Sequence, residues 1–167
     1  ANTTASKAET KAEETERFRT ALFTIDRQIQ SLMYILKPEG NELINYISGS
    51  PSSFTFVSNI SLWDRDLGYV LVSYEIERDT DNRLNIRTRE RLIGHPDEYT
   101  TYLLKGLDTA VFQYLYTENI NTEMSWHNEF KRKNGTPYAV RLIFKKDRWQ
   151  GTLNIPIRHF VQSTGIQ

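Results

Sequence analysis

An apolar stripe with helical spacing lies in the first quarter of the chain. Its members follow one another at alternating intervals of four and three residues, which is the spacing of one face of an α-helix. We call this set the helix stripe, and it consists of Phe18, Leu22, Ile25, Ile29, Leu32 and Leu36. Residues 6–17 are polar and rich in helix-favouring Ala, Glu and Lys, and Pro38 and Gly40 end the pattern. We therefore predict one helix over about residues 6–36, with a polar start that projects from the body.

After Gly40 the apolar residues alternate with polar ones, which is the pattern of half-buried β-strands. Two pairs of such segments flank short polar turns at residues 79–82 and 146–148, so we expect two β-hairpins. Residues 95–98 contain a proline and interrupt the alternation, and we predict that they cap a short helix that runs through Leu104. The expected strands cover residues 54–56, 69–78, 84–91, 107–116, 138–145 and 150–157.

These elements predict an α+β fold in which a long N-terminal helix packs on antiparallel sheets made of hairpins. Residues 1–17 are expected to form a polar tail and the projecting start of the helix. Residues 18–167 are expected to form one globular domain, with its β region over about residues 43–160.

Composition narrows the possible functions. The 167 residues include 21 Lys and Arg and 21 Asp and Glu, so the chain is formally neutral and a poor candidate for a general nucleic-acid binder. The absence of cysteine excludes disulfides, thiolate metal sites and cysteine nucleophiles. No stretch of sequence has the roughly 18 apolar residues of a membrane span. Because the chain starts with Ala1 and not with Met, we expect a processed or truncated product.

The sequence shows no pattern typical of an active site. His95, His127 and His159 have no histidine three or four residues away, as a helical zinc site would require. Residues 79–90 place a glutamate where a calcium loop ends, but Leu84 stands where that loop needs glycine. We therefore predict no catalytic residue, no metal ligand and no cofactor.

Charge is distributed unevenly along the second half of the chain. Residues 97–129 carry six Asp and Glu and one Lys, whereas residues 130–149 carry seven Lys and Arg and one Asp. These segments are either complementary solvated faces of neighbouring strands or a docking surface that orients other subunits. Tryptophan and arginine are common at interfaces. The candidate partner surface consists of Trp126, Lys131, Arg132, Lys133 and Trp149.

The order of these features resembles the J-class minor pseudopilins of the type II secretion system, over about residues 16–157. The long helix is followed by the string Leu-Leu-x-Gly-Leu at residues 103–107 and a strand with Phe112 and Tyr114. A tryptophan loop and the string Pro-x-Ala-Val-Arg-Leu at residues 137–142 come next. Minor pilins of type IV pili are similar enough to remain an alternative.

The resemblance implies a non-enzymatic subunit at the tip of a periplasmic pseudopilus that drives export of folded proteins across the outer membrane. It implies partners among the I and K class pseudopilins, the H class as a further partner, and contact with secreted exoproteins. It also implies a periplasmic globular domain held to the bacterial inner membrane by an N-terminal helix that this chain does not contain. No nucleic-acid partner is expected, and the alternative is a type IV pilus minor pilin in adhesion or DNA uptake.

The resemblance depends on the helix stripe. Its C-terminal part is expected to pack in the core, and its N-terminal part, with residues 6–17, is expected to face neighbouring subunits. This interpretation requires residues 18–36 to form a single continuous helix, and a break within that span would count against it.

Overall fold

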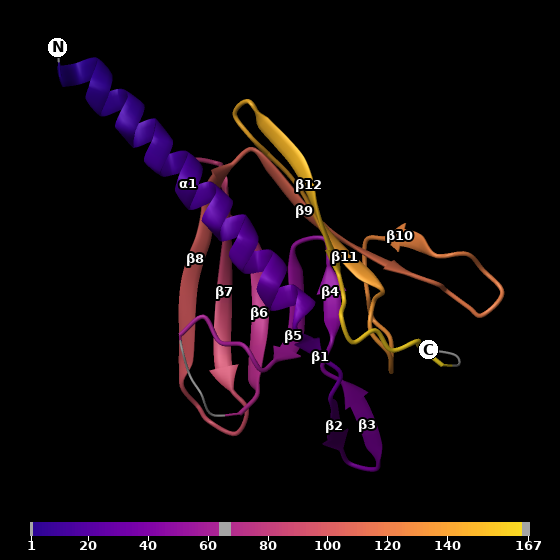
Figure 1. Ribbon diagram of the computed structural model, residues 1–167. Coiled ribbons are helices and arrows are strands. Elements are labelled where there is room, and N and C mark those ends of the chain that lie inside the picture. Colours follow the sequence, from indigo (N-terminus) through magenta and orange to yellow (C-terminus); the bar gives the residue numbers. More distant parts are fainter. Residues whose placement is uncertain (1, 64–67, 165–167) are drawn as a thin grey trace.

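A computed structural model describes residues 2–63 and 68–164 of the chain, which begins with one long helix (Figure 1). Helix α1 spans Asn2–Gln30, so an N-terminal helix is confirmed, but it ends six residues before the predicted end at Leu36. Ser31 follows as a turn residue whose hydroxyl donates a 2.7 Å hydrogen bond to the carbonyl oxygen of Gln28. Strands β1 (Leu32–Met33) and β2 (Leu36–Glu39) then take up the rest of the helix stripe. The continuous helix that the resemblance required is therefore broken at Ser31.

The rest of the described chain is built from antiparallel strands in three sheets. The large sheet has the order β1–β5–β6–β7–β8, with β4 paired to β5. Its further strands are β4 (Ser48–Ser50), β5 (Ser53–Ser58), β6 (Val70–Arg78), β7 (Leu84–Leu92) and β8 (Glu98–Leu107). The small sheet consists, in order, of β10 (Ser125–His127), β9 (Thr109–Tyr116), β11 (Ala139–Lys146) and β12 (Trp149–Pro156). The third sheet is the hairpin of β2 and β3 (Glu42–Asn45).

The predicted α+β class is wrong, because the described chain has one N-terminal helix and twelve strands in three sheets. The fold is mostly β-sandwich-like and is not a long helix packed on a sheet. Aromatic side chains of the two larger sheets pack on each other directly: the rings of Phe54 and Tyr114 are 5.4 Å apart, and those of Tyr74 and Phe112 are 6.5 Å apart. The core is thus formed mainly by two sheets, to which α1 adds a few residues from its second half.

Both predicted hairpins are confirmed. Strands β6 and β7 pair on either side of the turn at residues 79–82, and β11 and β12 pair on either side of the turn after Lys146. The predicted short helix after residue 98 is wrong, because that segment forms β8 at the edge of the large sheet. Side chains along β8 alternate between exposed and partly buried, which is the period of a strand.

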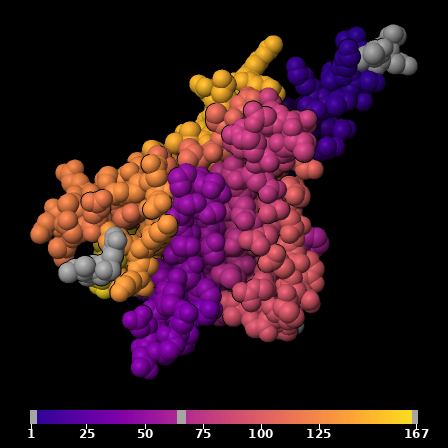
Figure 2. All heavy atoms as spheres, turned by 180° about the vertical axis from the view of Figure 1, so that it is seen from behind, coloured from indigo at the N-terminus to yellow at the C-terminus, as the bar shows by residue number. Residues whose placement is uncertain are grey.

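Helix α1 is divided into an exposed half and a half that joins the core. The side chains of residues 4–14 are exposed, and the start of the helix projects beyond the sheets (Figures 1 and 2). Phe18, Ala21, Ile25 and Ile29 are buried with the core residues of both sheets. Within residues 2–63 and 68–164, no helical segment combines the length and apolar character needed to span a bilayer.

Candidate interaction site

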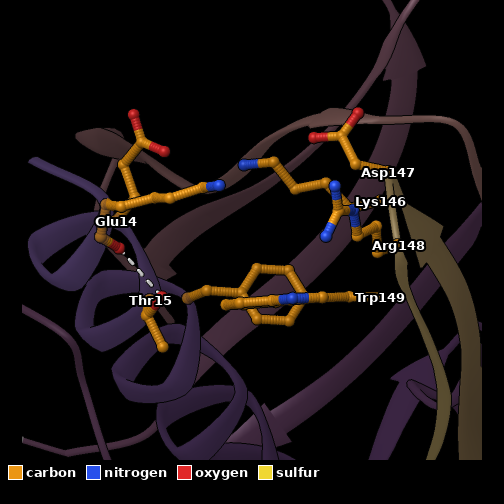
Figure 3. A pocket seen from close by; sticks show the side chains of 8 residues that line it. Glu14, Thr15, Lys146, Asp147, Arg148 and Trp149 are labelled. Carbon is orange, nitrogen blue, oxygen red and sulfur yellow. Dashed lines mark hydrogen bonds between the residues drawn. The ribbon is translucent and has the colours of Figure 1, made fainter. Parts of the chain in front are cut away.

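A groove of about 390 Å³ lies where α1 leaves the body of the protein (Figure 3). Helix α1 forms one wall, and the turn between β11 and β12 forms the other. The two walls come from opposite ends of the sequence, and only folding brings them together. The lining residues are Lys11, Glu14, Thr15 and Phe18 from the helix, and Lys146, Asp147, Arg148 and Trp149 from the turn.

Aromatic rings form the apolar part of the groove. The Phe18 ring packs edge to face on Trp149, with ring centroids 4.9 Å apart, and also contacts Phe144, with centroids 5.5 Å apart. Phe18 is 7% exposed, whereas Trp149 is 41% exposed. Trp149 therefore covers Phe18 with one part of its ring system and presents the remainder to solvent, where a binding partner could pack on it.

Hydrogen bonds and ion pairs fix the turn that carries Trp149. Arg83 reaches Asp108 at 2.6 Å and Asp147 at 3.3 Å through its two terminal nitrogens. The backbone NH of Asp147 donates a 2.9 Å hydrogen bond to the second carboxylate oxygen of Asp108. Asp147 itself has a φ of 52°, a left-handed conformation that aspartate tolerates better than most residues. These contacts connect the turn to the β6–β7 and β8–β9 junctions.

The groove carries more positive than negative charge. Lys11, Lys146 and Arg148 contribute cations, and Glu14 and Asp147 contribute carboxylates. Asp147 is already paired with Arg83, whereas none of the other four forms an ion pair within 4.0 Å of a described residue. Lys146 extends from the turn toward α1 and its ammonium nitrogen lies 5.8 Å from the Phe18 ring centroid. The arrangement suits a ligand with an apolar contact and carboxylates beside it.

The helix stripe is divided among three elements. Phe18, Ile25 and Ile29 are buried on α1, and Leu22 is partly buried beside them. Leu32 is buried on β1 and Leu36 is partly buried on β2. The role of the helix stripe in subunit assembly stays a prediction.

The structure does not bring the residues of the candidate partner surface together. Trp126 pairs with Leu115 near one end of β9, whereas Trp149 pairs with Lys146, beyond the other end of that strand. The Arg141 guanidinium covers the Trp126 ring at 4.2 Å. Trp149 belongs to the groove, and the role of the surface as a whole stays a prediction.

The basic run at residues 131–133 is not a uniform cationic patch. Arg132 is 6% exposed and its guanidinium donates to the carbonyl oxygens of Thr117 and Glu118, at 2.8 and 2.6 Å. Lys131 and Lys133 are exposed, and Lys131 lies 3.7 Å from Glu129. Only the two lysines of this run therefore present their charge to solvent.

Sequence reasoning missed all five charged groove residues, which are Lys11, Glu14, Lys146, Asp147 and Arg148. One signal could have found two of them, because Lys11 and Glu14 continue the buried face of α1 backwards from Phe18 at helical spacing. No sequence signal joins them to Lys146 and Arg148, which lie more than a hundred residues away in the chain.

A second cluster of polar groups is buried beneath the end of α1. The Tyr74 hydroxyl donates to the Gln28 side-chain oxygen at 2.6 Å, and the Gln28 amide donates to Glu90 at 2.8 Å. Glu90 also accepts hydrogen bonds from the Ser61 hydroxyl and the Leu62 backbone NH. Burial, and then the charge of Glu90, raises the pKa of Tyr74 well above its usual value. Because these groups bond to one another and are buried, the cluster holds α1 against the large sheet.

The described residues contain no group of three or more His, Cys, Asp or Glu side chains placed to hold a metal ion. The groove offers cations, a half-exposed tryptophan and a carboxylate, which together can bind a partner. Comparison with protein-family models, with curated proteins and with solved structures found no match, so the groove is interpreted from its own geometry.

Proposed function

We propose that this protein is a non-enzymatic assembly subunit that binds partner subunits through the exposed first half of α1. The observation that carries the proposal is the division of α1. Its second half is buried in the core through Phe18, Ile25 and Ile29, whereas the side chains of residues 4–14 are exposed and the start of the helix projects from the body. A helix fixed at one end and free at the other presents a rigid surface to a partner at little cost in conformational entropy.

The specific form of the proposal is a minor pseudopilin of the J class, at the tip of a type II secretion pseudopilus. The sequence strings at residues 103–107 and 137–142 support it. The expected continuous helix over residues 18–36 is not present, because α1 ends at Gln30, and this counts against the proposal. The proposal therefore rests on the projecting part of α1 and the order of the strands, and no longer on the length of the helix.

The proposed partners are the I and K class pseudopilins, with the H class and the secreted exoproteins as further contacts. In this role the globular body lies in the periplasm, and an N-terminal anchor holds the subunit to the bacterial inner membrane. The assembly would promote export of folded proteins across the outer membrane.

Mixing experiments test this role directly. The chain is combined with soluble I and K class domains and analysed by size-exclusion chromatography with light scattering. We expect a complex that contains all three chains, and we expect Ala8→Arg with Ala12→Arg to prevent it, since both substitutions add bulk and charge to the exposed helix. The matched control is Ser52→Arg with Asn59→Arg, at exposed positions just before and just after β5. Three separately eluting chains at every concentration would contradict the proposal.

The alternative role in DNA uptake has less support. The basic run at residues 131–133 leaves only Lys131 and Lys133 exposed, because Arg132 is held by backbone carbonyls. Single-stranded DNA binding usually combines a positively charged groove with aromatic rings on which bases stack. Trp126, the tryptophan nearer to this run in the sequence, is covered by Arg141.

A further inference from the structure

The two faces of the exposed half of α1 differ in charge, because one is mixed and the other is acidic. One face lines the groove with Lys11 and Glu14, and Phe18 follows on the same side. The other face carries an acidic stripe, which we define as Glu9, Glu13 and Glu16. Successive residues of a helix turn by about 100°, so Glu9 lies about 200° around the axis from Lys11, and Glu16 lies about 200° from Phe18.

The acidic stripe is poorly compensated within its own helix. Its members are spaced by four and three residues, so they are neighbours on the helix surface and repel one another. Arg17 approaches Glu13 at 3.7 Å, but both side chains are largely exposed, and such pairs contribute little. Neither Glu9 nor Glu16 forms an ion pair within 4.0 Å of another residue in the described part of the chain. An external cationic surface would relieve this repulsion.

The groove supplies such a surface. Lys11, Lys146 and Arg148 lie around the half-exposed ring of Trp149, and their charges have no ion-pair partner among the described residues. These three cations outnumber the one unpaired carboxylate of the groove, that of Glu14. The Arg83 contacts hold the turn that carries Lys146 and Arg148, so the backbone from which these cations extend is positioned before any partner arrives. Electrostatic complementarity of this kind sets the orientation of a complex and speeds its formation.

We propose that the groove binds the acidic stripe of a second copy of this chain. The two surfaces lie on opposite sides of α1, so one copy can offer its stripe while its own groove is occupied. Contacts between two different surfaces of identical chains are heterologous, and they extend into open filaments unless the rotation between copies closes a ring. The proposal is independent of the mixed complex proposed above, because it concerns the chain alone.

Charge reversal in the pure protein tests this inference. Sedimentation velocity over a range of protein concentrations, in about 0.05 M and about 0.5 M salt, measures self-association and its screening. We expect association of the unmodified chain at low salt and at least about tenfold weaker association at high salt. We expect Lys11→Glu with Arg148→Glu, and separately Glu9→Lys with Glu16→Lys, each to weaken association by about tenfold or more at low salt.

Mixing the two double variants provides the decisive result. Each variant alone has a groove and a stripe of the same sign, whereas a mixture pairs opposite signs at every contact, so association should return. The matched control is Lys131→Glu with Glu39→Lys, at exposed positions outside both surfaces, and it should associate like the unmodified chain. Circular dichroism checks that every variant is folded. A monomer at all concentrations up to about 1 mM, or no recovery in the mixture, would overturn the inference.

Discussion

At the scale of single residues, Gln28 connects the end of the helix to the large sheet. Its amide donates to Glu90 and to the carbonyl oxygen of Ile60, and its side-chain oxygen accepts from Tyr74. Glu90 is a carboxylate that is only 2% exposed, and buried charges are tolerated where hydrogen bonds satisfy them. The position of α1 therefore depends on a polar network as well as on apolar packing.

Replacing Tyr74 by Phe should change how stability depends on alkaline pH. Burial raises the pKa of Tyr74, so the folded protein holds the phenol proton more tightly than the unfolded chain does. The stabilisation is complete below the unfolded value of about 10 and is lost as pH rises above it, by up to about 1.4 kcal/mol per pH unit for each such tyrosine. Burial also raises the pKa of Tyr114, so Tyr74→Phe should reduce this slope without abolishing it.

Urea unfolding between about pH 9 and about pH 11 measures this slope. Below pH 9 the variant should also be less stable by about 1–3 kcal/mol, because the Gln28 oxygen loses its donor. Tyr69→Phe, at an exposed tyrosine, is the control and should leave the slope unchanged. A slope for Tyr74→Phe equal to that of the unmodified chain would show that this tyrosine does not contribute.

At Gly49 the packing leaves no room for a side chain. A Cβ atom there would clash with the ring of Tyr114, whose hydroxyl donates to the carbonyl oxygens of Ser50 and Ser53 at 2.7 and 2.9 Å. We expect Gly49→Ala to destabilise the fold by about 1–3 kcal/mol, because the ring must leave these acceptors. Gly40→Ala is a control with open space around it, although its positive φ adds a small strain of its own. Equal unfolding midpoints for the two variants in urea would contradict this account.

At the scale of elements, helix α1 shows how far the sequence could predict the structure. The helix and its buried face were foreseeable from Phe18, Ile25 and Ile29. The end of the helix was not foreseeable, because Leu32 and Leu36 are four residues apart. Residues at that spacing share one face in a helix, and they also share one face in a strand. The Ser31 hydroxyl bonds to the Gln28 carbonyl and to Ser58 on β5, and Ser58 is a partner that local sequence does not reveal.

The sequence did not predict strand β8 or the groove, because both depend on partners that are distant in the sequence. The proline at position 96 indicated a break, but the segment after it forms a strand because β7 supplies its hydrogen-bonding partner. The groove needs Lys11 beside Lys146, and no sequence pattern links these positions. Of the candidate partner surface, Trp149 alone lines the groove, and only folding distinguishes it from Trp126.

The attachment of α1 to the β11–β12 hairpin depends on Phe18. Phe18→Ala removes a buried ring that contacts Trp149 and Phe144, and it should destabilise the fold by about 3–5 kcal/mol. Hydrogen exchange over residues 16–24 should accelerate, because this part of the helix loses its packing. Phe23→Ala is the matched control, since Phe23 is 60% exposed and its loss should change stability by less than about 0.5 kcal/mol. Similar losses of stability in both variants would show that Phe18 is not the attachment point.

At the scale of the whole molecule, one polar junction connects the two larger sheets where the groove begins. Arg83 follows β6, Asp108 lies between β8 and β9, and Asp147 lies between β11 and β12. Asp108 accepts from both the Arg83 guanidinium and the Asp147 backbone NH. One carboxylate thus links the large sheet, the crossing to the small sheet and the turn that bears Trp149.

Asp108→Ala should therefore weaken the fold and the groove together. Loss of the partly exposed ion pair contributes about 0–1 kcal/mol, and loss of the hydrogen bond from Asp147 about 1 kcal/mol more, so unfolding in urea should require about 1–2 kcal/mol less. Hydrogen exchange of residues 145–150 should accelerate, because the turn loses the side-chain hydrogen bond that ties Asp147 to the β8–β9 junction. Asp81→Ala, at an exposed position in the β6–β7 turn, is the control and should change neither quantity. If Asp108→Ala lowers stability while exchange at the turn stays slow, the junction stabilises the sheets without positioning the groove residues.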